Sequence, residues 1–247
     1  MSRWKAAAIH LSISVAIGLA AAALIFGVWY PAPYSQAAGA GELVLLLLGV
    51  DVVLGPLLTL VIFRSGKKGL KFDLAVIAVM QACALTYGLS VVTRARPAFI
   101  VAAVDRFTLV TANDLDAADL AQGSKPEFQS VSWTGPKLVG VEMPQDTKSH
   151  NDLVFSGAAG KDIEQFPKYY VDYAQTAKSM LARAKPLDVL RKVRPEAAPL
   201  LEDWLHGHNR DAATIAWLPL TTQTKSLVML LDRTSGQVLD ALPIDPW

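Results

Sequence analysis

The sequence has very little cysteine, and its first part has very little charge. Cys83 is the one cysteine among 247 residues, so no intramolecular disulfide can form and a disulfide-stapled scaffold is excluded. Residues 1–93 carry only six basic and three acidic side chains. Residues 94–247 carry 17 basic and 19 acidic side chains without a basic stripe, which argues against nucleic acid as a partner.

What the first part has instead is long apolar runs. Residues 6–30, 43–63 and 72–93 are each about as long as a helix must be to cross the hydrocarbon core of a bilayer. From Arg94 onward the composition becomes that of an ordinary globular protein. We therefore expect a three-helix transmembrane module over residues 1–93 and a soluble domain over residues 94–247.

The few basic residues of the first part predict its orientation. They lie before the first run and between the second and third: Arg3, Lys5, Arg64, Lys67, Lys68 and Lys71. The loop over residues 31–42 has no lysine or arginine. By the positive-inside rule we expect the N-terminus to be cytoplasmic and residues 94–247 to be extracytoplasmic. Arg94 and Arg96 oppose this assignment, but six basic positions outweigh two.

The soluble part shows strand patterns at both ends with helical patterns between them. Residues 98–111 read as one or two strands interrupted at Asp105-Arg106, and residues 214–244 read as three strands that include a hairpin. A helix is expected from Pro167 to residue 184, with Tyr170 on its buried face, after a polar loop over residues 144–152. The predicted class is α+β, a mixed antiparallel sheet with helices.

Asp51 is the most unusual residue of the apolar runs, because a carboxylate inside a membrane span is costly. At 1.5 Å of rise per residue, Asp51, Gln81 and Ser14 fall within roughly 6 Å of one another in depth. These three side chains are therefore predicted to form a polar layer that holds the three helices together.

A second interpretation concerns the residues that follow Asp51. Gly55 and Thr59 lie on the same helix face as Asp51, and Pro56 leaves the carbonyl of Val52 without its usual donor. This small, polar stripe could dock the transmembrane helix of a partner, or it could face the inside of the bundle. Of the two, we expect the docking face, with Gly55, Pro56 and Thr59 as partner-binding residues.

Asp105 and Arg106 form a second candidate partner site. In a strand their side chains would lie on opposite faces, and Arg94, Arg96 and Arg106 could form a basic edge near the membrane. An edge strand here would accept a partner by strand addition. The alternative is a pair of solvated charges with one structural ion pair.

Several motifs resemble those of one family over nearly the whole chain. They are GVDVVLGPLLTLVIF (49–63), GLKFDL (69–74), RP (96–97), VDRF (104–107), GKDIEQFPKYYVDY (160–173) and PIDPW (243–247). Together they resemble the type IV pilin accessory proteins, the TfpX/TfpZ (FimB-like) family. Phe166 departs from the pattern, which has a basic residue before the proline.

The resemblance implies a bacterial inner-membrane protein that binds a cognate type IV pilin and promotes its assembly or handling, without enzymatic activity or cofactor. Other pilus components and the lipid bilayer are further expected partners. The alternative is a membrane-anchored sensor whose outer domain binds a small ligand and acts through a partner. Glu202, His206 and His208 lack a second ligand cluster, so no metal site is predicted.

Overall fold

The computed structural model describes residues 1–247, apart from the side chain of Leu43. The chain divides into two compact units. The first holds residues 1–35 and 39–95, and the second holds residues 36–38 and 96–247. The division at residue 95 lies close to the composition change that the sequence shows at Arg94.

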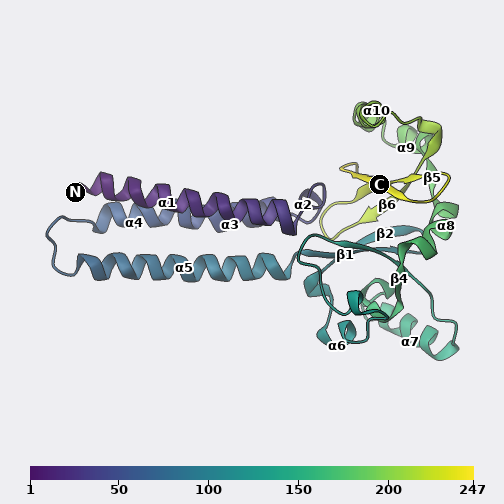
Figure 1. The fold of residues 1–247 in the computed structure, drawn as a ribbon, viewed down its shortest axis with the longest axis horizontal. Helices are drawn as coiled ribbons and strands as arrows, with labels where there is room; N and C mark the ends of the chain where they lie inside the picture. The colour runs from purple at the N-terminus through teal and green to yellow at the C-terminus, as the bar shows by residue number, and fades with distance from the viewer. The chain divides into compact units, whose positions relative to one another are not determined.

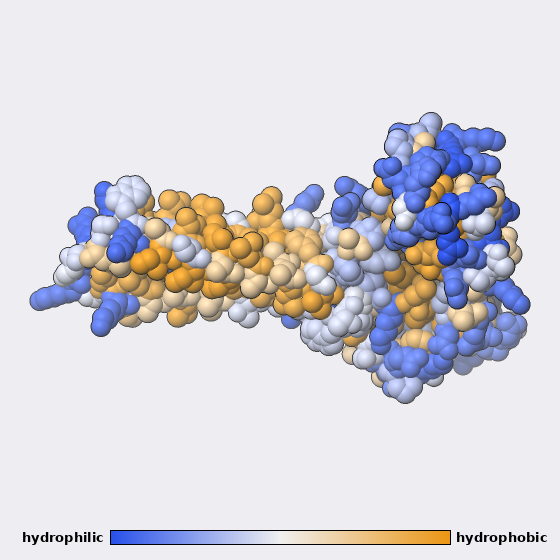
Figure 2. Space-filling view, turned by 45° about the horizontal axis from the view of Figure 1, so that its top comes forward, coloured by the Kyte–Doolittle hydropathy of each residue, from blue (hydrophilic) through white to orange (hydrophobic). Residues whose placement is uncertain are grey.

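The first unit consists of three long apolar helical stretches (Figure 1). The first is α1 (Arg3–Leu24) with a π-helical turn, Ile25–Trp29; the second joins α3 (Ala40–Gly49), a π-helical turn at Val50–Leu54 and α4 (Gly55–Ile62); the third is α5 (Leu70–Arg94). Their lengths of 27, 23 and 25 residues and their composition suit membrane spans. In Figure 2 their surface is mostly apolar, with hydrophilic residues at the end that carries the N-terminus.

The second unit is built on one eight-stranded mixed sheet. Its strands are β1 (Pro97–Ala103), β2 (Arg106–Thr111), β3 (Lys137–Val141), β4 (Tyr170–Asp172), β5 (Lys185–Pro186), β6 (Ile215–Thr221), β7 (Leu227–Asp232) and β8 (Val238–Leu242). The order is β4-β3-β1-β2-β6-β7-β8, and β5 also pairs with β6. Neighbours are antiparallel except β1–β3 and β2–β6, which are parallel. The expected α+β class is confirmed.

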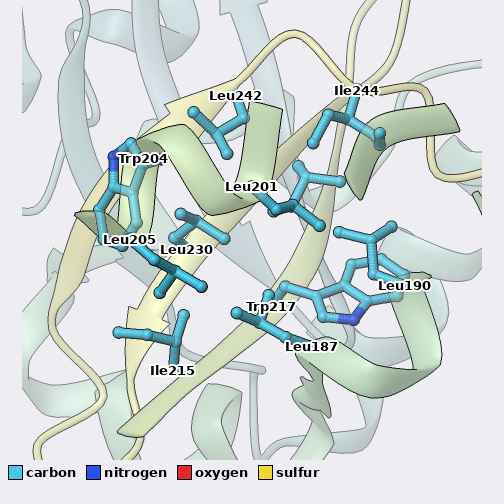
Figure 3. Packing of buried hydrophobic residues seen from close by; sticks show 12 residues of the cluster. Leu187, Leu190, Leu201, Trp204, Leu205, Ile215, Trp217, Leu230, Leu242 and Ile244 are labelled. Atoms are coloured by element: carbon cyan, nitrogen blue, oxygen red, sulfur yellow. The ribbon is translucent and has the colours of Figure 1, made fainter. Parts of the chain in front are cut away.

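Helices and two apolar clusters complete this unit. The helices are α6 (Ala117–Leu120), α7 (Thr147–Ala158), α8 (Tyr173–Arg183), α9 (Leu187–Val193) and α10 (Ala198–Gly207), and the short α2 (Tyr34–Ala37) precedes α3. Figure 3 shows one cluster, in which Leu187, Leu190 and Leu201 of α9 and α10 pack on Trp217 and Leu230 of the sheet. The other cluster surrounds Phe99 and Tyr170 near β1 and β4.

Two local expectations are corrected. The helix expected from Pro167 begins at Tyr173, because Tyr170 pairs with Val141 in the sheet and packs its ring 5.1 Å from that of Phe99. The polar loop expected over residues 144–152 contains the start of α7, whose first turn is capped by the Asp146 carboxylate accepting from the Ser149 N–H at 2.8 Å. The first correction comes from a sheet contact between distant parts of the chain, and the second from a local N-cap.

Candidate functional site

A chain of hydrogen bonds through His10 links the three spans. The His10 ring places Nδ1 2.6 Å from the Thr59 hydroxyl oxygen and Nε2 2.7 Å from Oε1 of Gln81. The Gln81 amide in turn donates from Nε2 to the backbone carbonyl of Asp51 at 3.0 Å. Polar side chains from α1, α4 and α5 thus meet inside an otherwise apolar bundle.

The partner groups determine which atom donates and which accepts in each of these hydrogen bonds. Since Nε2 of Gln81 donates to Asp51, its Oε1 is the acceptor and His10 must donate from Nε2. With a neutral imidazole, Nδ1 of His10 then accepts a hydrogen bond from the Thr59 hydroxyl. Both ring nitrogens of His10, the Thr59 hydroxyl and the Gln81 amide then all have hydrogen-bond partners with a neutral imidazole.

Pro56 explains why Gln81 bonds to the backbone of Asp51. In a π-helical turn the carbonyl of residue i accepts from the N–H of residue i+5, and for Asp51 that residue is Pro56, which has no N–H. The carbonyl of Asp51 therefore lacks its π-helical donor and accepts from Gln81 instead. A Cβ on Gly55 would lie 2.1 Å from Nε2 of Gln81, so this close approach requires glycine.

The Asp51 side chain faces a cavity of about 210 Å³. Ser14 and Gln81 also line it, so the three residues of the predicted polar layer surround one space. Asp51 is 8 % exposed. Atom Oδ1, however, is buried and has no hydrogen-bond donor among the described residues. An intramembrane carboxylate with an unsatisfied oxygen is a candidate functional site.

The expectation that Gly55, Pro56 and Thr59 form an open docking face is corrected. All three residues are buried inside the first unit. Thr59 bonds to His10 of α1, and Gln81 of α5 covers Gly55. This face is therefore covered by α1 and α5 of the same chain, because its small residues let each of these two helices come close to α4.

His10 is the residue of this site that the sequence interpretation missed. It lies four residues before Ser14 and eight before Gly18, so the three share one face of α1. A single ionisable side chain on the face that carries the buried Ser14 was the signal that could have identified it. The apolar residues around it give no other indication of its two partners.

Asp105 lies in the turn between β1 and β2 and Arg106 is the first residue of β2, so neither lies on an edge strand of the sheet. Their side chains form an exposed ion pair at 2.9 Å, which lowers the pKa of the Asp105 carboxyl and raises that of the Arg106 guanidinium. Both β1 and β2 have neighbours on each side, so the expected strand addition is excluded here. Arg96 is buried, donating to the Ser132 carbonyl at 2.9 Å, and cannot belong to an exposed basic edge.

Arg106 also lines an open cleft of about 330 Å³ in the second unit. Its floor lies where β2 meets β6, at the paired residues Thr108 and Thr221. Thr108 donates to the Glu164 carboxylate at 3.3 Å, and Asp114 and Asp162 complete an acidic rim. This cleft is the second candidate site.

Glu202 and His208 near the end of α10 have other partners. Glu202 binds the Arg191 guanidinium at 2.6 Å, and the His208 ring stacks on Trp204 at 4.5 Å. Within the described part of the chain, no group of three or more His, Cys, Asp or Glu side chains could hold a metal ion.

Comparisons with known proteins identify relatives that share almost the whole chain. The family of the fimbrial assembly protein FimB matches residues 1–39. The fimbrial assembly protein of Dichelobacter nodosus serogroup E1 is 33% identical over 98% of this chain and 95% of its own length. The protein of serogroup I of that organism is 32% identical over the same shares. No solved structure matches.

Proposed function

The chain belongs to the family of FimB-like fimbrial assembly proteins, and from this membership we propose that it binds a cognate type IV pilin and promotes its assembly into the pilus. The observation that carries the proposal is the extent of the similarity. The alignment to two fimbrial assembly proteins runs through 98% of the chain and so includes both the helical unit and the soluble unit. A role in fimbrial assembly therefore concerns the whole chain rather than one shared segment.

The two-unit construction suits a subunit-handling factor. The three apolar helices can contact a pilin while it is still in the bilayer, and the soluble unit can contact its globular part. When two linked contacts engage the same partner, the second gains from a high effective concentration. Each contact can then be weak, which allows the subunit to be released into the growing fibre.

We also propose the location and orientation of the protein. The three spans lie in the bacterial inner membrane, with the N-terminus and the loop around Lys67 and Lys68 in the cytoplasm. The soluble unit then lies in the periplasm. Alkaline phosphatase fused after Trp247 should be active, and the same enzyme fused at Lys68 should be inactive; the reverse pattern would contradict this orientation.

Within this proposal the protein is not an enzyme. His10 and Asp51 lie in the same polar site, but both ring nitrogens of His10 are already bonded inside the bundle. The site therefore presents no general base with a free nitrogen, and its hydrogen bonds serve to hold helices together.

The test is to express the full-length chain in membranes together with the pilin of its own organism. We expect the pilin to co-purify after detergent extraction, and a strain that lacks the gene should lose most of its surface pili, with recovery on complementation. An unrelated three-span protein with the same tag is the matched control. Normal piliation without the gene, together with no captured pilin, would refute the proposal.

The Arg106 cleft supports a second candidate function, a ligand-binding sensor. Its volume of about 330 Å³ lies at the lower end of the range for small-molecule sites, and threonines and carboxylates line it. Its acidic rim favours a cationic ligand such as a small amine. An increase in the melting temperature of the purified chain on adding polyamines, lost in Glu164→Gln, would favour the sensor function. No increase with any polyamine would rule out the sensor function.

A further inference from the structure

The cavity beside Asp51 opens between α1 and α5 as a groove on the outside of the three-helix unit. We name it the α1–α5 groove; it is lined by His10, Ile13, Ser14, Ile17, Gly18, Leu48, Asp51, Ala78, Gln81, Ala82 and Leu85. Its rim is accessible from outside the unit, because Ile13 is 54 % and Ile17 47 % exposed. Leu48 and Asp51 of the second span lie between the residues that α1 and α5 contribute.

Asp51, which lines the groove, has an acceptor atom that its own bundle does not satisfy. Oδ1 of Asp51 is buried and lacks a donor among the described side chains and backbone groups. His10 cannot supply one, because its Nε2–H donates to Oε1 of Gln81 and its Nδ1 accepts from the Thr59 hydroxyl. In a hydrocarbon environment an unsatisfied polar group of this kind costs several kcal/mol, so a donor from outside is strongly favoured.

The position of Asp51 decides where that donor comes from. Asp51 lies 11 residues from Ala40 and 11 residues from Ile62, the two ends of its span (51 − 40 and 62 − 51). At 1.5 Å per residue the carboxylate is roughly 16 Å from either end, beyond the reach of lipid headgroups. Acyl chains carry no donor, so another transmembrane helix is the source that fits this depth.

The groove can receive one side chain of a neighbouring helix whose backbone stays outside it. The cavity of about 210 Å³ can hold a side chain but is too small for a helix backbone. Ala78 and Ala82, both exposed on α5, let a neighbouring backbone come close. The isoleucines on the α1 side offer an apolar wall for the rest of that helix.

We propose that the α1–α5 groove receives the transmembrane helix of the pilin subunit, which places an N–H or O–H donor against Oδ1 of Asp51. This inference rests on the proposed function, since it takes the pilin as the partner, and it assigns the contact to a different face from Gly55 and Thr59. The α1–α5 groove is thus the binding surface, and the hydrogen bonds of His10 and Gln81 hold together the helices that form it.

Site-specific photo-cross-linking tests the position of the contact. A photoreactive phenylalanine derivative replaces Ile17, on the groove rim, or Leu19, which is 67 % exposed two residues further along α1 and does not line the groove. With the full-length chain and the pilin in one membrane, we expect cross-links to the transmembrane segment of the pilin from position 17, at least fivefold more than from position 19. Equal yields from both positions would overturn the inference.

Substitutions test the chemistry. Asp51→Leu removes the carboxylate acceptor. It keeps the hydrogen bond between Gln81 and the backbone carbonyl of residue 51, so the bonds that join the helices are retained. Ala82→Leu fills the groove, and Ala84→Leu adds the same bulk on another face of α5. We expect the first two variants to reduce the cross-link at position 17 at least fivefold and Ala84→Leu to leave it unchanged.

The outcomes separate the groove from the proposed function. If the pilin co-purifies but Asp51→Leu and Ala82→Leu keep the full cross-link, the groove is not the binding surface and the proposed function stands. If the unaltered chain captures no pilin and supports no piliation, the proposed function fails and the inference fails with it. The fraction of each variant that elutes as monodisperse protein in detergent verifies that it is folded.

Discussion

The hydrogen bonds of His10 should make a measurable contribution to the stability of the three-helix unit. His10→Leu keeps an apolar side chain of similar size but removes the bonds to Thr59 and Gln81, which measure 2.6 and 2.7 Å. Hydrogen bonds between membrane helices average about 0.6 kcal/mol and reach about 1.7 kcal/mol. The loss of two should therefore lower the free energy of unfolding by about 1–3 kcal/mol.

A double-mutant cycle isolates the direct contact. His10→Leu, Gln81→Leu and the double variant are unfolded reversibly in mixed micelles with increasing dodecyl sulfate, and helix loss is followed by circular dichroism. Because His10 and Gln81 share one hydrogen bond, we expect a coupling of about 0.6–1.7 kcal/mol. Gln81→Leu alone should also destabilise the unit, since it leaves the backbone carbonyl of Asp51 without a donor.

Ser12→Leu is the matched control. Ser12 lies two residues from His10 on α1, but its hydroxyl donates only to the Ala8 carbonyl of the same helix, at 3.0 Å. Its replacement should leave the unfolding midpoint nearly unchanged. A coupling below about 0.3 kcal/mol between His10 and Gln81, or an equal loss in Ser12→Leu, would show that the network does not hold the helices together.

Three further predictions concern other parts of the chain. Gly55→Ala should cost roughly 1–3 kcal/mol in the same unfolding assay, because the new methyl group would displace Gln81, and an unchanged midpoint would contradict the close approach. Val104, a β-branched residue at φ 57° in the β1–β2 turn, should be replaceable by glycine with a gain of about 1 kcal/mol; a loss would show that the turn is not strained. Burial raises the pKa of Tyr173 to about 12, so stability that is complete below pH 10 should fall by roughly 2–3 kcal/mol as the pH rises to 12, and Tyr173→Phe should remove that part of the alkaline loss.

The sequence alone determined the features that depend on composition along the chain. The length and apolar character of the three spans follow from residue type, because a bilayer demands about 20 apolar residues per helix. The β-forming residues of 98–111 and the hairpin after residue 225 likewise predicted strands. The structure buries β1 along its whole length and all but the last residue of β7. The depth of Asp51, Gln81 and Ser14 could be worked out from the rise of a helix, which is a property of the backbone.

Only the tertiary structure decided which faces of the helices meet. Depth says nothing about rotation, so Gly55 and Thr59 could equally have faced lipid or the bundle, and the structure places both inside. Packing also brought His10 of α1 to Gln81 of α5, 71 positions away, and left Oδ1 of Asp51 buried without a donor. Contacts between residues far apart in the chain depend on how side chains fit together, and that fit is set by the whole bundle rather than by any local pattern.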